Sequence, residues 1–194
     1  MRIFFVTATV LAIALSGCSS EVSPKTEAIA QDQFFANLSS HCGKGYQGKL
    51  VSTDEVDADM ANSMMQMKVG PCSDTEIRIP FHVDDNQSRT WVITRTDQGL
   101  RLKHRHGHKD GTEDTVSQYG GDTAAPGTAS RQEFPVDQFS IDMFNKEGLT
   151  ASVTNVWAVG ITPDIYAYEL RRENRHFRVE FDLNNPIGNI PDPW

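Results

Sequence analysis

The chain has 194 residues, of which 38% are hydrophobic and 23% charged, and its formal net charge is −8 at pH 7. This length is sufficient for one domain with a substantial core, and no change in composition along the chain indicates a second domain. An acidic protein has no general electrostatic attraction for nucleic acid or anionic lipid headgroups, so neither is expected as a partner.

The N-terminal segment has the pattern of a bacterial export signal. Arg2 precedes an apolar run over residues 3–15, which is shorter than the roughly 20 residues needed to span a bilayer. The run ends in a Leu-Ser-Gly-Cys tetrad, and this tetrad, which ends at Cys18, resembles the lipobox of bacterial lipoproteins. The resemblance implies a signal peptide over residues 1–17, acylation of Cys18, and a polar tether over residues 18–26.

The lipid bilayer is therefore the partner that this segment predicts. Bacterial lipoproteins carry several acyl chains, and two or more chains anchor a protein stably. Ser19 rather than aspartate follows Cys18, which by analogy with the Gram-negative sorting pattern predicts an outer-membrane anchor facing the periplasm. The alternative is a plain secretory signal in which Cys18 is incidental.

Export also determines the expected state of the two remaining cysteines, Cys42 and Cys72. In an oxidising compartment two leftover thiols usually pair, so a disulfide between them is predicted. The alternative is a thiolate metal ligand or redox centre, but no Cys-x-x-Cys spacing supports it.

The periodicity of apolar residues predicts a helix followed by many strands. The helix covers residues 27–38, where Phe34, Phe35 and Leu38 recur at near-helical spacing. Later runs alternate apolar and polar residues and are separated by short turns rich in Gly, Asp and Asn, which is typical of an antiparallel meander. Strands are predicted at residues 49–51, 65–69, 77–83, 90–94, 100–103, 116–119, 130–136, 153–161, 165–172 and 177–183.

A second helix is predicted over residues 137–147. Asp137 is its expected N-cap and Gly148 its expected end. Residues 120–129, rich in Gly, Ala, Thr and Pro, are expected to form a loop. The domain is thus predicted to cover residues 27–185, and a Pro-rich tail over 186–194 is expected to be held by Trp194.

The predicted fold class is mainly β, an antiparallel meander of eight to ten strands. Meanders of this size avoid exposed edges by closing into a barrel, here with the N-terminal helix over one end. A helix followed by a glycine and an aromatic residue at the start of the first strand, here Gly45 and Tyr46, resembles the calycin class of barrels. Tyr46 stands where lipocalins usually carry Trp. The alternative is an open sheet with the second helix packed on one face.

Seven sequence blocks also carry a resemblance to a family. They are His41–Lys44, Ile77–Val83, Ser88–Thr96, Leu100–His104, Tyr119–Thr123, Arg131–Pro135 and His176–Leu183. These blocks, which are spread over most of the chain after Cys18, resemble an uncharacterised family of bacterial secreted proteins and lipoproteins. The resemblance implies no activity.

The main candidate site is a histidine tract. Leu100, Leu102, His104, His106 and His108 share one parity, so a regular strand would direct the imidazoles to the apolar, interior face of the barrel. The alternative is that the strand ends early and the histidines lie in a solvated hairpin. The cationic residues interleaved with the histidines favour this second interpretation.

If the strand is regular, the tract predicts a ligand pocket. Trp91 and Arg95 are expected on the neighbouring strand with the same parity, and Tyr119 across the next turn. The candidate ligand-binding residues are Trp91, Arg95, His104, His106 and Tyr119.

The same tract is a candidate metal site with His104, His106 and His108 as ligands. Neutral imidazole suits Zn²⁺ or Cu²⁺, and Glu113 and Asp114 could add oxygen ligands. Haem held by one interior histidine is a less favoured alternative.

Three classes of function follow. The favoured one is a non-catalytic binding module with a small ligand or metal inside the barrel. A structural or interaction lipoprotein with a filled core is the first alternative, and an enzyme that uses His104 and His106 is the second. A barrel of about eight strands can hold either side chains or one small ligand, so the state of the interior distinguishes the first two.

Overall fold

The computed structural model describes the backbone from Pro24 and the side chains from Ile29 to Trp194. The predicted signal peptide, the predicted lipidation site Cys18 and most of the predicted tether lie outside the described residues. Within the described residues, no helix is both long enough and apolar enough to cross a membrane.

Over this part of the chain the structure has ten strands, two α-helices and two short 3-10 helices. Their bounds are α1 Pro24–Ser39, β1 Gly45–Leu50, η1 Glu55–Met60, β2 Met65–Lys68, β3 Glu76–Val83, β4 Asn86–Thr96, β5 Gly99–His106, β6 Tyr119–Asp122, β7 Arg131–Pro135, α2 Gln138–Lys146, η2 Thr150–Thr154, β8 Val156–Ile161, β9 Ile165–Arg172 and β10 Arg175–Ile187. The predicted fold class, a mainly β meander of eight to ten strands with an N-terminal helix and one further short helix, is confirmed.

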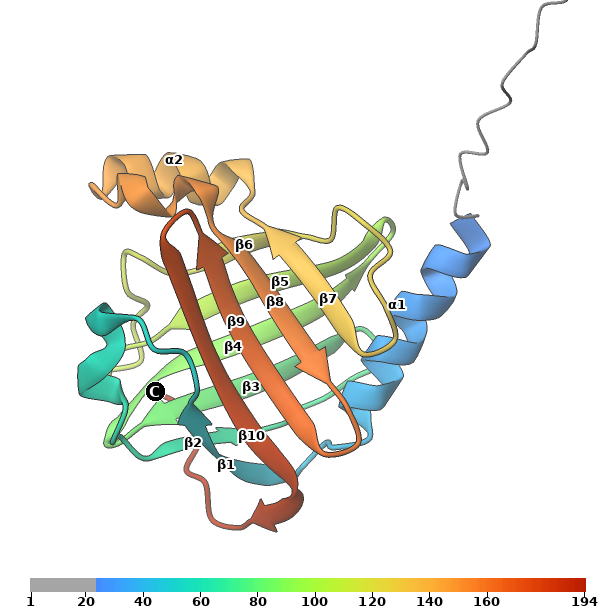
Figure 1. Cartoon of the computed structure of the whole chain (residues 1–194), viewed down its shortest axis with the longest axis horizontal. Helices are drawn as coiled ribbons and strands as arrows, with labels where there is room; N and C mark the ends of the chain where they lie inside the picture. The colour runs from blue at the N-terminus through green and yellow to red at the C-terminus, as the bar shows by residue number, and fades with distance from the viewer. Residues whose placement is uncertain (1–23) are drawn as a thin grey trace, which may run out of the picture.

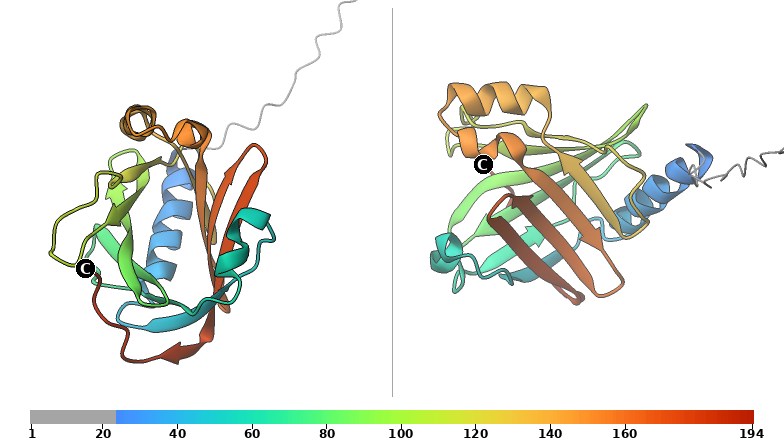
Figure 2. Two further views of the ribbon diagram at one scale, coloured as in Figure 1. Left: turned by 90° about the vertical axis from the view of Figure 1, so that its left-hand side faces the viewer. Right: turned by 45° about the horizontal axis from the view of Figure 1, so that its top comes forward.

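The strands form one antiparallel sheet in the order β6-β5-β4-β3-β2-β1-β10-β9-β8-β7. The sheet curls into a nearly closed barrel, as Figure 1 and Figure 2 show. Its seam lies between β6 and β7, where the first turn of α2 bridges the two edges. The N–H of Asp137 donates to the carbonyl oxygen of Gly120 at 2.9 Å, and the N–H of Gly120 donates to the hydroxyl of Ser140 at 2.8 Å. These bonds satisfy backbone groups that an open edge would leave unpaired.

The strand β6 differs from the prediction, because it runs through glycines that were expected to start a loop. A Cβ atom at Gly120 would lie 1.9 Å from the carbonyl oxygen of Leu102, and one at Gly121 would lie 1.7 Å from that of Pro135. Only glycine allows the backbones to approach so closely at the seam. Residues 116–118, predicted as strand, precede β6 and lie outside it.

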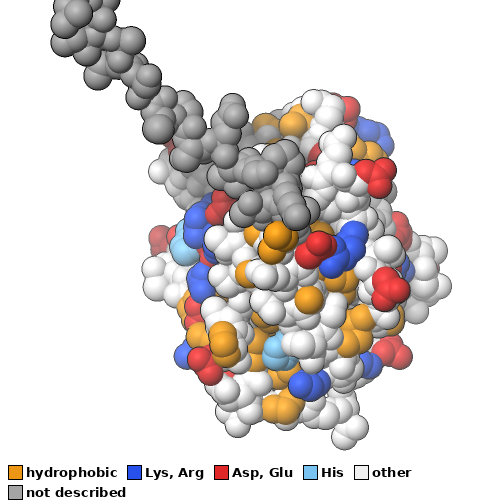
Figure 3. Space-filling view, turned by 90° about the vertical axis from the view of Figure 1, so that its right-hand side faces the viewer, with side chains coloured by type: hydrophobic (Ala, Val, Ile, Leu, Met, Phe, Trp, Pro, Cys, Tyr) orange, Lys and Arg blue, Asp and Glu red, His pale blue; other side chains and the backbone are white. Residues whose placement is uncertain are grey.

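The helix α1 covers one end of the barrel (Figure 1) and starts at Pro24 rather than at residue 27. The amide of Gln31 donates to the hydroxyl of Thr123 at 3.0 Å, and that of Asn37 donates to the carbonyl oxygen of Ala129 at 2.9 Å. The space-filling view of this side, Figure 3, shows hydrophobic side chains exposed in several places among charged ones. The helix buries Phe34, Phe35 and Leu38 in the core.

The helix α2 has the predicted ends. The carboxylate of Asp137 caps it by accepting the N–H of Ser140 at 2.9 Å. Gly148, with φ of +74°, ends it in the left-handed conformation that glycine adopts at no steric cost.

The C-terminal tail crosses the outside of the sheet. Asp192 lies 3.6 Å from the ammonium of Lys68. The N–H of Trp194 donates to the carbonyl oxygen of Gln87 at 3.2 Å, and Arg105 donates to the carbonyl oxygen of Trp194 at 2.7 Å. Trp194 therefore holds the tail, as the sequence led us to expect.

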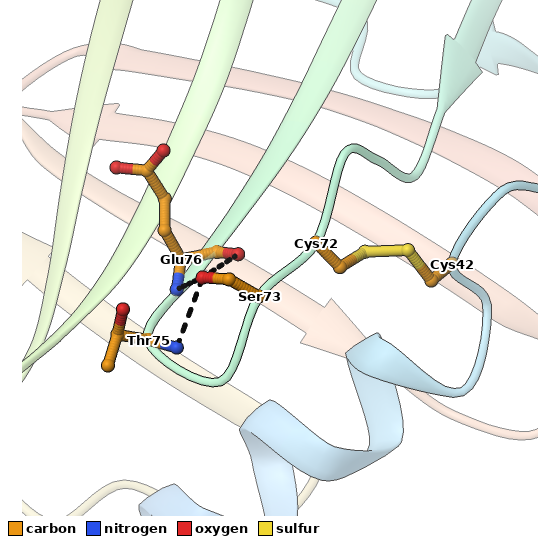
Figure 4. The surroundings of a disulfide bond; sticks show 5 residues. All are labelled: Cys42, Cys72, Ser73, Thr75 and Glu76. Atoms are coloured by element: carbon orange, nitrogen blue, oxygen red, sulfur yellow. Dashed lines mark hydrogen bonds between the residues drawn. A yellow bond between two sulfur atoms is a disulfide. The ribbon is translucent and has the colours of Figure 1, made fainter.

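Cys42 and Cys72 form the predicted disulfide, with their Cα atoms 6.2 Å apart (Figure 4). Cys42 follows α1, and Cys72 lies in the loop between β2 and β3. The hydroxyl of Ser73 stabilises this loop by accepting the N–H groups of Thr75 at 3.3 Å and Glu76 at 3.0 Å. The bridge therefore fastens the end of the helix to the sheet.

The double replacement Cys42→Ser/Cys72→Ser is expected to lower the free energy of unfolding by about 3–4 kcal/mol. The bridge joins cysteines 30 positions apart, and loop-closure entropy for a loop of that length gives this magnitude. Urea denaturation measures the loss, and reduction of the wild-type protein is the control that should reproduce it. An unchanged free energy of unfolding in the double variant would contradict the prediction.

Candidate functional site

The barrel end opposite α1 contains a cavity of about 200 Å³. In the left view of Figure 2 this end faces the viewer, and α1 lies behind it at the far end of the barrel. The cavity wall comes from the first halves of β4, β6 and β10, the second halves of β3 and β5, the middle of β9, and η1. Among its lining residues are Arg89, Trp91, His104, His106, Tyr119 and Tyr168.

An aromatic stack fills the barrel beside the cavity. The ring of Trp91 lies between Phe81, with centroids 4.6 Å apart, and Tyr168, with centroids 4.3 Å apart. All three side chains are buried and point inward from β3, β4 and β9. The interior beside the cavity is therefore occupied by aromatic rings, and each face of the Trp91 ring is covered by a neighbouring ring.

His104 lies in register with Trp91 and is buried. Its Nδ1 lies 3.0 Å from the carbonyl oxygen of Tyr119, and its Nε2 lies 2.7 Å from the hydroxyl of Tyr168. A carbonyl only accepts, so Nδ1 carries the proton and donates, while Nε2 accepts from Tyr168. Burial lowers the pKa of His104 to about 3, so the ring is neutral at physiological pH.

His106 is the next inward residue of β5. Its Nε2 lies 3.0 Å from the hydroxyl of Tyr119, and its backbone N–H donates to the hydroxyl of Ser117 at 3.0 Å. Burial, followed by the positive charge of Arg89, lowers the pKa of His106. Burial also raises the pKa of Tyr119 to about 12, so both side chains are uncharged near neutral pH.

The solvated-hairpin interpretation of the histidine tract is wrong. β5 continues through His106, and His104 continues the inward face of Leu100 and Leu102. His108 follows the strand and is half exposed, with its Nε2 3.8 Å from a carboxylate oxygen of Asp114.

The three histidines that were candidate metal ligands do not converge on one point. Both ring nitrogens of His104 are occupied by tyrosine oxygens, and His108 faces solvent. Over the described residues, no group of three or more His, Cys, Asp or Glu side chains is arranged to hold a metal ion.

Arg95 shares the parity of Trp91 but lies at the other end of the barrel. Four residues of strand separate the two positions by about 13 Å. The guanidinium of Arg95 pairs with the carboxylate of Asp32 and lies 4.2 Å from the ring centroid of Phe35, both on α1. The structure therefore brings Trp91, His104, His106 and Tyr119 together and separates Arg95 from them.

Arg89 is one of the lining residues, with Tyr168 and Arg175, that the sequence reasoning missed. It lies opposite His106 in the β4–β5 ladder, two residues before Trp91, and its Nη1 is buried without a hydrogen-bond partner. The other arginine at this cavity, Arg175, donates to both carboxylate oxygens of Asp57, at 2.5 and 2.7 Å. The sequence did contain one indication of this residue, because Arg89 lies two positions before Trp91 and therefore on the same side of the strand.

Two further hollows differ from this cavity in their surroundings. One of about 300 Å³ shares His106, Tyr119 and Tyr168 with it and extends toward Trp157. The other, of about 640 Å³, lies beside the irregular pairing of β1 and β10 and shares no lining residue with the histidine cavity. The histidine cavity thus has an adjoining second chamber.

No protein-family model matches this sequence, and neither curated proteins nor solved structures include a significant match. The resemblances to bacterial lipoproteins, to the calycin class and to a secreted bacterial family therefore remain predictions from the sequence.

Proposed function

We propose that this protein is a non-catalytic binding module of the bacterial cell envelope that holds a small ligand in the open end of its barrel. The observation that carries the proposal is the cavity of about 200 Å³, which has aromatic walls and a few convergent polar groups. Small-molecule sites in proteins commonly have this composition. Acylation of Cys18 would tether the module to the outer membrane, on its periplasmic side.

The distribution of packing in the barrel favours binding over a purely structural role. At one end α1 inserts Phe34 and Leu38 into the core, both fully buried. At the other end the strands surround a hollow lined by Arg89, whose guanidinium has no carboxylate within ion-pair distance among the described residues. A charge without an oppositely charged partner contributes little to the stability of a barrel, so this placement favours a role in binding.

The hydrogen bonds of His104 disfavour the enzymatic alternative. A general base needs a free lone pair on its ring, but Nδ1 of His104 is protonated toward Tyr119 and Nε2 accepts from Tyr168. His104 therefore orients two tyrosines and has no lone pair left to receive a proton.

Native mass spectrometry of protein purified from its own membranes tests the proposal. We expect the wild-type protein to retain a species of added mass. Leu170 lines both adjoining chambers, so Leu170→Trp should fill the space and remove that species. The matched control is Met64→Trp, because Met64 is 49% exposed and does not line the cavity. A wild-type protein that retains nothing and binds no compound from a mixed library of acids, bases and neutral compounds would overturn the proposal.

A further inference from the structure

We propose that the ligand of this cavity is a small organic carboxylate, held by the guanidinium of Arg89 with its apolar or aromatic body against Trp91 and Tyr168. This inference rests on the proposed binding function and names the ligand class. The juxtaposition that carries it is the guanidinium of Arg89, which has no carboxylate partner among the described residues, beside a stack of aromatic rings in one cavity.

The first step concerns the positive charge of Arg89, which has no carboxylate partner. A guanidinium has five N–H donors, no acceptor and a charge that it keeps in proteins, so a buried one requires an acceptor of opposite charge. Within the described residues, no carboxylate lies within ion-pair distance of Arg89. An anion bound in the cavity would supply the missing acceptor.

The second step concerns the acidic groups nearest to this cavity. Asp57 faces it from η1, but its two carboxylate oxygens accept from Arg175. Asp54 also accepts from Arg175, at 3.0 Å, and from the N–H of His176, at 2.7 Å. The carboxylate of Asp114 accepts the N–H of Val116 at 2.8 Å in the loop that precedes β6. Each carboxylate is thus bound elsewhere.

The third step concerns the remaining polar groups of the wall. His104, His106, Tyr119 and Tyr168 are neutral and already bonded in pairs, and Thr90 adds a neutral hydroxyl without a partner. Among the described lining residues, Arg89 is therefore the charge without a partner. A single guanidinium is matched by one carboxylate, whose two oxygens accept two parallel N–H bonds. Recognition of a multiply charged anion would require further cations.

The fourth step concerns the rest of the ligand. Apolar and aromatic surface lines the hollow, contributed by Trp91, Tyr168, Phe177 and Leu170. Such walls suit an apolar or aromatic body, and a volume of about 200 Å³ limits it to a small molecule. Benzoate has the charge, shape and size that these features select, and benzamide is its neutral counterpart of equal shape.

The experiment is isothermal titration of the full-length protein in detergent with benzoate and with benzamide. We expect benzoate to bind and benzamide to bind at least about 10-fold more weakly, since hydrogen bonds to charged groups contribute this much. Arg89→Gln should reduce benzoate affinity by at least about 10-fold and leave benzamide affinity unchanged. The matched control is Arg95→Gln, which removes an inward arginine of the same strand at the other barrel end and should leave both affinities unchanged.

A second measurement excludes a merely structural role for Arg89. Removing an unpaired, partly buried charge should raise the melting temperature of the ligand-free protein by about 2–4 °C in Arg89→Gln. A lower melting temperature would mean that Arg89 stabilises the fold, and would overturn the inference.

The failure of this inference is distinguishable from the failure of the proposed function. If the wild-type protein binds benzamide as tightly as benzoate, or if Arg95→Gln weakens benzoate as much as Arg89→Gln does, the carboxylate assignment is overturned and the binding function stands. If neither probe binds, the carboxylate assignment is likewise overturned, and the species retained from the membranes decides the binding function.

Discussion

Replacing Glu169 with Gln is expected to lower the free energy of unfolding by about 2–4 kcal/mol. The Glu169 side chain is only 1% exposed on the outer face of β9, where it accepts from Arg131 at 2.5 Å and pairs with Arg171 and Arg178. Removing one member of a buried ion pair costs about 3–5 kcal/mol, and partial exposure of the three arginines reduces this figure. The loss would leave the three like charges close together without the buried carboxylate that all three share.

The matched control for this prediction is Glu133→Gln. Glu133 belongs to the same group of charges and lies 3.0 Å from Arg131, but its side chain is 53% exposed. Exposed ion pairs contribute about 1 kcal/mol or less, so the control should be close to the wild type. Urea denaturation of both variants at pH 7 measures the free energies of unfolding. Equal losses of this free energy in the two variants would show that burial does not make Glu169 more stabilising than Glu133.

The pH dependence of stability provides a second readout for Glu169. Burial alone would raise the pKa of Glu169, but the hydrogen bond from Arg131 and the positive charges of Arg131, Arg171 and Arg178 lower it to about 2 from an ordinary value of 4.5. A carboxyl group whose pKa is lower in the folded state contributes its full stabilisation above pH 4.5 and loses it as the pH falls toward 2. Glu169→Gln should flatten the stability curve over this acidic interval.

The strands could be predicted from sequence because most of them keep a period of two. β6 could not, because Gly120 and Gly121 have no side chains to show a period. The reason for these glycines is the close approach of Leu102 and Pro135, which only the folded barrel reveals. The seam of the barrel is therefore the part of the fold that the apolar pattern could not locate.

The histidine tract was misjudged because its cations were taken as a sign of solvent. The ammonium of Lys103 pairs at 2.5 Å with Asp137 at the start of α2, and Arg105 donates to Trp194 in the tail. Both partners are distant in sequence, so the local pattern gave no indication that the strand would continue to His106. The parity argument predicted the inward direction of His104 correctly, since it depends only on the alternation of side chains along a strand.

At the candidate site, Arg89 and Arg95 show a similar limit of what the sequence can predict. Both share the parity of Trp91, and the alternating pattern does not distinguish them. Arg95 meets Asp32 because α1 covers that end of the barrel, whereas Arg89 has an unpartnered nitrogen at the end that no helix covers in the same way. The difference between a structural ion pair and a candidate ligand contact is thus decided by which end α1 occupies.

Replacing Phe34 with Ala in α1 is expected to lower the free energy of unfolding by about 3–5 kcal/mol. Phe34 is fully buried, and truncation of a buried phenylalanine removes apolar contact and leaves a cavity that the surrounding barrel closes only in part. The matched control is Ile29→Ala on the same helix. Because Ile29 is 47% exposed, this replacement should lower the free energy of unfolding by about 1 kcal/mol or less. Urea denaturation gives both values.

The same pair of variants also tests whether the two barrel ends act independently. Phe34 lies at the end that α1 covers, and the cavity with Arg89 lies at the opposite end. Sites that share no contacts affect stability and binding additively, so Phe34→Ala should lose stability and, where still folded, retain the ligand affinity of the wild type. Equal losses of stability in Phe34→Ala and Ile29→Ala would mean that α1 contributes little to the core. Loss of ligand affinity in folded Phe34→Ala would mean that its packing also shapes the open end.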